Sequence, residues 1–120
     1  MLRFFDCNVA IGRWKHPNYG AYETADELEA ILDYTQVDRA IVYHAQAHET
    51  HAPIGNAKLM EELAGHPRLL PSWVIFPHFT GEMPEPAALV AEMLACGVRV
   101  VRLMPGYTGH RFSKYPLPRP

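Results

Sequence analysis

Arg39-Ala40-Ile41-Val42-Tyr43-His44 is the stretch that decides the fold, because apolar residues fill its centre without interruption. A strand with one face in water alternates apolar and polar residues, whereas a continuous apolar run is typical of a parallel strand covered by helices. Residues 2–11, 69–76 and 98–104 have the same character. The four segments begin about every 30 to 35 residues on average, which is the length of one strand, one helix and two loops. We therefore predict four parallel strands.

Three helices are predicted between these strands, each with a recognisable beginning. Thr24 and Glu27 have the spacing of a capping box ahead of an apolar stripe. Asn56 is expected to cap the second helix, and Pro86 suits the first turn of the third. The second and third helices are expected to end at Gly65 and Gly97.

The predicted order, βαβαβαβ, defines an α/β fold in which successive crossovers place all four strands parallel and adjacent. We predict a partial TIM-type barrel over residues 1–112 and a proline-rich irregular tail over residues 113–120. A complete barrel needs roughly 250 residues, so four strands supply about half of one. The two edges of a half-barrel must be covered by loops or by a partner chain, and a homodimer would do so.

Composition narrows the classes of function. The chain is 48% apolar with a net charge of -2, and its charges are interspersed, so no basic stripe is available for nucleic acid. No apolar run approaches the ~20 residues that cross a bilayer. The N-terminus has no signal-peptide pattern, and both Cys7 and Cys96 lie in apolar segments. We expect a cytoplasmic protein with two reduced, buried thiols and a small molecule as its partner.

Polar side chains stand at the end of each predicted strand, where ligands gather in β/α folds. These are Asp6 and Asn8 on the first strand, His44 on the second, His78 after the third and Arg102 on the fourth. A neutral imidazole can act as a general base, and an arginine can bind a carboxylate through two hydrogen bonds.

Each of these residues also has a purely structural interpretation. Asp6 can accept loop amides and Asn8 can cap the strand end. Arg102 can pair with a helix acid. His48 and His51 are expected on a surface loop, whose spacing fits no fixed ligand geometry.

The first strand also carries a family resemblance. Phe5-Asp6-Cys7-Asn8-Val9-Ala10-Ile11-Gly12 resembles the first strand of the amidohydrolase superfamily, in its amidohydrolase-related or metal-dependent hydrolase branch. The signature there is an Asp followed by His-x-His and then a Gly. The resemblance extends in the same order to about Phe112, through residues 37–42, 55–56, 66–69 and 97–103.

The resemblance implies a barrel enzyme that holds a divalent metal such as zinc. In the family, two histidines on one face of the first strand ligate the metal. Asn8 and Ala10 occupy those positions here, and alanine cannot ligate. We therefore predict no metal ligand in this chain, and its cofactor stays undefined.

Three functional hypotheses follow, of which the third is a small open-sheet binding module that is not part of a barrel. In the first, the chain is part of an amidohydrolase-related hydrolase or decarboxylase that acts on a small carbonyl or carboxylate compound. Asn8, His44 and His78 are then the catalytic candidates, while Asp6 and Arg102 bind the substrate. In the second, the chain is a non-catalytic half-barrel, a fragment or an oligomerising scaffold whose relatives place their chemistry on further strands.

Overall fold

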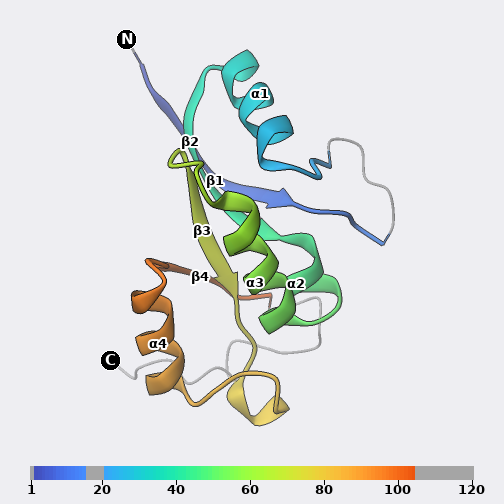
Figure 1. Ribbon diagram of the computed structural model, residues 1–120, viewed down its shortest axis with the longest axis vertical. Coiled ribbons are helices and arrows are strands. Elements are labelled where there is room, and N and C mark those ends of the chain that lie inside the picture. Colours follow the sequence, from blue (N-terminus) through green and yellow to red (C-terminus); the bar gives the residue numbers. More distant parts are fainter. Residues whose placement is uncertain (1, 16–20, 105–120) are drawn as a thin grey trace.

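A computed structural model describes residues 2–15 and 21–104, except the side chain of His78. The fold is α/β, with four parallel strands in one sheet. The helices follow the sheet from α1 at the β1–β2 end to α4 at the β4 end (Figure 1). In chain order the elements are β1 (Phe4–Ile11), α1 (Ala25–Thr35), β2 (Val37–His44), α2 (Ala45–Glu49), α3 (Ala52–Leu63), β3 (Leu69–Val74), the 3-10 helix η1 (His78–Thr80), α4 (Pro86–Ala95) and β4 (Val100–Arg102).

The sheet is curled into a half-barrel. Its strand order is β1-β2-β3-β4, so β1 and β4 are separated by two strands. At a strand spacing of about 4.8 Å, a flat sheet would hold β1 and β4 about 14 Å apart. Arg102 on β4 nevertheless donates a 2.8 Å hydrogen bond to Asn8 on β1. The sheet must therefore bend to bring the middle of β1 and the end of β4 together.

The hydrophobic core lies between the sheet and its helices. Val9 and Ile11 of β1 and Ala40 and Val42 of β2 are buried in it. Helices α1 and α3 contribute apolar stripes to the same cluster, and β3 contributes Leu69 and Trp73. These helix residues are Ala25, Leu28, Leu32, Ala52, Leu59 and Leu63. Burial of this one face confirms the helix-covered parallel strands predicted from the apolar runs.

Helix α1 begins as predicted, with one difference. The Thr24 hydroxyl accepts the backbone N–H of Glu27 at 3.2 Å, which is half of a capping box. The Glu27 carboxylate accepts the backbone N–H of Glu23 at 2.9 Å instead of that of Thr24. The Glu27 carboxylate thus binds the amide one residue before the one that a capping box uses, and the Ala25 N–H is accepted by the Glu62 carboxylate at 2.8 Å.

The predicted cap at Asn56 is wrong, because α3 begins four residues earlier. Pro53 occupies the first turn of α3, where a missing N–H costs nothing. Asn56 is inside the helix, 2% exposed. Its amide donates to the carbonyl of Val74 at 2.9 Å, and its oxygen accepts the N–H of Val74 at 3.0 Å. Asn56 therefore joins α3 to the end of β3.

The strand–helix alternation is only partly regular, since α2 and η1 are additional to the predicted order. The expected loop after β2 is instead α2, which packs closely on α3. A Cβ atom at Gly55 would overlap the backbone of Ala47, so this approach requires glycine. Pro86 begins α4 as predicted. The predicted tail, residues 113–120, lies outside the described residues, as do residues 105–112 of the predicted domain.

The two cysteines are exposed and unpaired with each other, not buried as predicted. Cys7 lies at an irregularity of β1 that breaks the expected alternation, and Cys96 follows the last turn of α4. In the described part of the chain, no helix has the length and apolar character needed to span a membrane.

Candidate functional site

Arg102, at the end of β4, is the centre of the candidate site. Its Nη1 donates to Oδ1 of Asn8 at 2.8 Å, and its Nη2 donates to the backbone carbonyl of Cys7 at 3.2 Å. The guanidinium carbon lies 4.3 Å from the centre of the Tyr43 ring, in a cation–π contact. We call Asn8, Tyr43 and Arg102, with Trp14 and His48 beside them, the strand-end cluster.

A β-bulge on β1 exposes both groups that Arg102 contacts there. Asp6 pairs with Ala40 and Val9 pairs with Val42, so Cys7 and Asn8 together lie opposite the single residue Ile41. The Asp6 carboxylate accepts the N–H of Asn8 at 2.9 Å and holds the bulge closed. Bulges re-aim side chains near functional sites, and this one turns the Cys7 carbonyl and the Asn8 amide toward Arg102.

Trp14 extends the cluster beyond the end of β1. Its ring makes edge contacts with Tyr43 at 6.3 Å and with His48 at 5.7 Å between ring centres. Burial raises the pKa of Tyr43, and the positive charge of Arg102 opposes this rise. Burial also lowers the pKa of His48, with Arg102 acting in the same direction and Glu49 against it. At neutral pH the cluster therefore holds a neutral phenol, a neutral imidazole and one cation.

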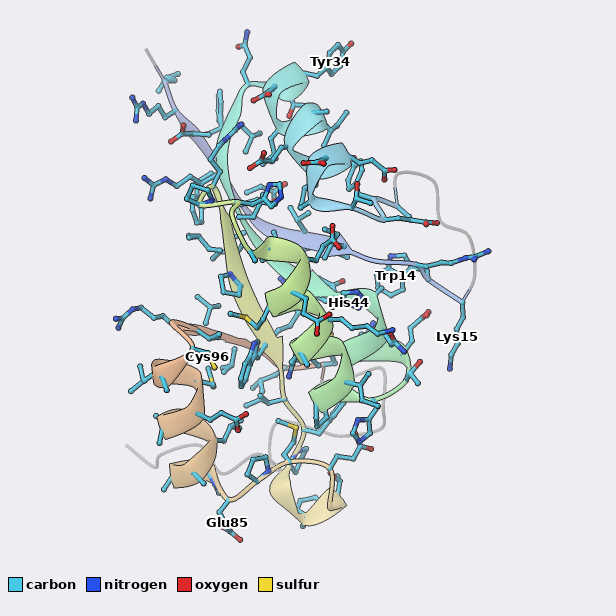
Figure 2. All side chains as sticks on the ribbon, viewed as in Figure 1. Trp14, Lys15, Tyr34, His44, Glu85 and Cys96 are labelled. Atoms are coloured by element: carbon cyan, nitrogen blue, oxygen red, sulfur yellow. The ribbon has the colours of Figure 1, made fainter. Side chains whose placement is uncertain are left out.

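His44 is not brought to this cluster. Its Nδ1 accepts the backbone N–H of Gln46 at 3.1 Å, which caps α2. Burial lowers the pKa of His44, and the nearby Lys58 of α3 lowers it further, while Glu62 acts in the opposite direction. Strand alternation places His44 with the helices and Tyr43 on the opposite face of the sheet. Figure 2 shows His44 beside α3.

The remaining predicted residues have different outcomes. Asp6 accepts a backbone amide, as its structural interpretation anticipated. Arg102 pairs with Asn8 and not with a helix acid. His78 is the first residue of η1, beyond the end of β3, and its side chain lies outside the described part of the chain.

Three cluster residues were missed by sequence reasoning. His48 was expected on a surface loop, but it lies in α2 and is half-buried against Trp14. Tyr43 belongs to the apolar run that predicts the second strand, and its one-residue offset from His44 places it on the other face of the sheet. One signal of this cluster was available in the sequence: the aromatic residue Trp14, two residues after Gly12, follows the end of the first strand.

A hollow of about 430 Å³ adjoins the strand-end cluster and shares Trp14 with it. The Lys15 ammonium group donates to the Glu49 carbonyl at 3.0 Å, and the Glu49 carboxylate accepts the Lys15 N–H at 2.7 Å. These bonds hold residues 12–15, which follow β1, against α2. The hollow is lined by Arg13, Trp14, Lys15, Gln46, Glu49 and Thr50.

The divalent metal implied by the resemblance does not fit the first strand. Ala10 has no ligating atom, and the Asn8 oxygen already accepts a hydrogen bond from a cationic group. Within residues 2–15 and 21–104, no three His, Cys, Asp or Glu side chains are grouped so that they could hold a metal ion. The positive charge in the cluster is therefore that of Arg102.

No family model, curated protein or solved structure matches the chain.

Proposed function

We propose that this chain forms part of a TIM-type, amidohydrolase-related hydrolase or decarboxylase acting on a small carbonyl or carboxylate compound in the cytoplasm. In this proposal the strand-end cluster binds the substrate, and residues 1–112 form the barrel portion. The half-barrel sheet supports it, because β/α barrels bind ligands at the carboxyl ends of their strands. The resemblance of the first strand supports the choice of family.

The contact between Asn8 and Arg102 carries the proposal. A guanidinium has five N–H donors, and the cluster uses one on each of Nη1 and Nη2. The Arg102 Nε atom is buried and has no hydrogen-bond partner among residues 2–15 and 21–104. Asn8, the Cys7 carbonyl and the Tyr43 ring hold the guanidinium in place, so little side-chain entropy is lost when an anion binds.

The roles of the other groups follow from their charge. Arg102 binds a carboxylate or a polarised carbonyl oxygen, and the Asn8 amide adds two N–H donors beside it. His48 is neutral at pH 7 and adds no charge to the site. In this proposal His44 supports α2, while His78 keeps its role as a catalytic candidate.

Binding of benzoate, compared with neutral benzamide, tests the proposal. Trp14 fluorescence should report saturable benzoate binding, because Trp14 contacts two residues of the cluster. We expect Arg102→Gln to weaken benzoate binding at least tenfold and to weaken the binding of benzamide, which lacks the negative charge, by a smaller factor. Arg99→Gln is the matched control, since Arg99 is exposed three residues away. Benzoate binding that is unchanged in Arg102→Gln would contradict the proposal.

Turnover is the second measurement. A panel of small carboxylates, amides and esters is incubated with the chain and followed by NMR for loss of the carboxyl group or cleavage of the bond. Turnover that disappears in Arg102→Gln supports the proposal that the chain is part of an enzyme. Binding without turnover of any compound favours the second candidate function.

The second candidate is an oligomerising half-barrel, and exposed aromatic residues on the edge strand favour it. Phe4 is 55% exposed and Phe5 is 51% exposed on β1. In the described chain the second backbone pairing of β1 is a single bridge at its far end, from Ile11 to Tyr22, and the side chain of Arg102 contacts its middle. An edge strand with apolar side chains and free N–H and C=O groups is a template for pairing with another chain.

A further inference from the structure

A second hollow lies in the helix layer, between α3 and α4 and above β3. Its volume is about 510 Å³, within the range of small-molecule sites. Trp73 of β3 is one of its walls, and Trp73 precedes Val74, which pairs with Arg102. Strand alternation therefore puts this hollow on the opposite face of the sheet from Arg102. Its lining consists of Pro53, Asn56, Ala57, Met60, Trp73, Glu82, Met83, Pro84, Leu89, Glu92 and Cys96.

The inner walls of this cavity are apolar. Trp73, Met83 and Leu89 are only 6–7% exposed, and Met60 is partly buried against the same core. Thioether and indole groups are polarisable and adapt to the shape of an apolar ligand. The buried Asn56 offers little to a ligand, because its amide oxygen and nitrogen are both bonded to Val74.

Among the described residues, the charged lining is acidic. Glu82 and Glu92 are the ionised residues of that lining, and both are exposed, so they lie at the solvent side of the cavity. Within residues 2–15 and 21–104, and apart from the side chain of His78, no Lys, Arg or His lines the cavity. A carboxylate ligand would be repelled at this entrance, whereas an ammonium group would be attracted to it and could also lie against the Trp73 ring.

We propose that this cavity binds a small organic cation, with an apolar and preferably aromatic body between Met60, Trp73 and Leu89 and an ammonium group near Glu82 and Glu92. The proposal is independent of the function assigned to the strand-end cluster. The two sites have opposite charge preference, since Arg102 selects anions and this cavity selects cations.

The probe is 2-naphthylmethylammonium, and 2-naphthoate is its anionic counterpart of similar shape. The indole N–H of Trp73 is buried and without a partner in the described chain, so its NMR signal should respond to a ligand in the cavity. The Trp14→Phe variant assigns the two indole signals. We expect a saturable shift of the Trp73 signal with the cation and at least tenfold weaker binding of naphthoate.

Two variants test the location. Ala57 is exposed on α3 and lines the cavity, so Ala57→Phe should fill it and weaken cation binding at least tenfold. Ala30→Phe, on the exposed surface of α1, is the matched control.

The double variant Glu82→Gln with Glu92→Gln should weaken cation binding at least threefold. Glu85→Gln should not, because Glu85 lies outside the lining at the start of α4 (Figure 2). An absent Trp73 shift, equal affinity for naphthoate, or unchanged binding in both the Ala57 and the double Glu variants would overturn the proposal.

Discussion

At the scale of single residues, the chain uses polar side chains to connect elements that its apolar core leaves separate. Asn56 connects α3 to β3, and Arg68 connects α1 to β2. The Arg68 guanidinium pairs with Asp33 at 2.7 Å and donates to the carbonyls of Val37 and Asp38. The same residue type at position 102 connects β4 to β1. The proposed recognition of anions depends on Arg102, a connector of this kind whose guanidinium keeps unused N–H donors.

Asn56→Leu should destabilise the protein strongly. The substitution leaves the N–H and C=O of Val74 buried without partners, which costs about 2 to 4 kcal/mol in total. Urea unfolding followed by circular dichroism measures this free energy. Glu61→Ala on the exposed face of the same helix should change it by less than about 0.5 kcal/mol. A loss in Asn56→Leu as small as that of the control would show that water replaces the Asn56 amide.

The residue scale is also where prediction from sequence was weakest. The strand-end positions of His44 and Arg102 could be found, because apolar runs define where strands end, whereas Asn8 was predicted at a strand end and lies inside β1, three residues before its end. The face of the sheet that each side chain occupies could not be predicted in every case, since the bulge at Cys7 and Asn8 changes the alternation on β1. Tyr43 and His48 were missed because no local pattern shows which side chains a curled sheet brings together.

At the scale of elements, α2 depends on the protonation state of its cap. His44 accepts the Gln46 N–H through Nδ1, which requires a neutral imidazole with a lone pair on that atom. Protonation would replace the acceptor with a donor. The folded state therefore disfavours the charged form, in agreement with the lowered pKa of His44.

Stability should fall on acidification because of this cap. The unfolded chain protonates His44 near the ordinary pKa of 6.5, while the folded chain does so only at lower pH. Stability is therefore full above pH 6.5 and is lost as pH falls through the folded pKa. His44→Asn keeps a capping acceptor without a titrating group and should flatten this part of the profile.

Urea unfolding at several values between pH 7.5 and pH 5 measures the effect. A residual slope should remain from His48, whose pKa is also lowered. Thr24→Ala, at the cap of α1, is the control. It should lower the free energy of unfolding by about 1 kcal/mol at every pH. A profile in His44→Asn as steep as that of the original chain would contradict the assignment.

Elements were predicted better than residues. Four strands and three of the helices follow from apolar runs and from capping residues such as Thr24 and Pro86. The short α2 and η1 have too few residues for a periodic pattern. The predicted beginning of α3 was wrong. Asn56 is a residue type that often caps helices, but here it lies inside the helix and bonds to the buried backbone of Val74.

At the scale of the whole molecule, the exposed edge of β1 predicts the assembly state. If the second candidate function holds, size-exclusion chromatography with light scattering should give a dimer, and Phe5→Asp should convert it to a monomer. Tyr34→Asp is the control, because Tyr34 is 85% exposed on α1 away from the edge. A monomer in the original chain, at concentrations up to about 100 µM, would remove the support for self-association through β1.

The order of the strands has a further consequence for how the chain acquires its shape. Each of β2, β3 and β4 pairs with the strand that precedes it, so sheet growth can follow the order of synthesis. The bond from Arg102 to Asn8 spans 94 residues and cannot form until β4 is present. Because contacts between distant residues form slowly, closure of the curl is expected as the final folding event. Nascent chains that stop short of position 102 would display the first three strands as an open, uncurled sheet.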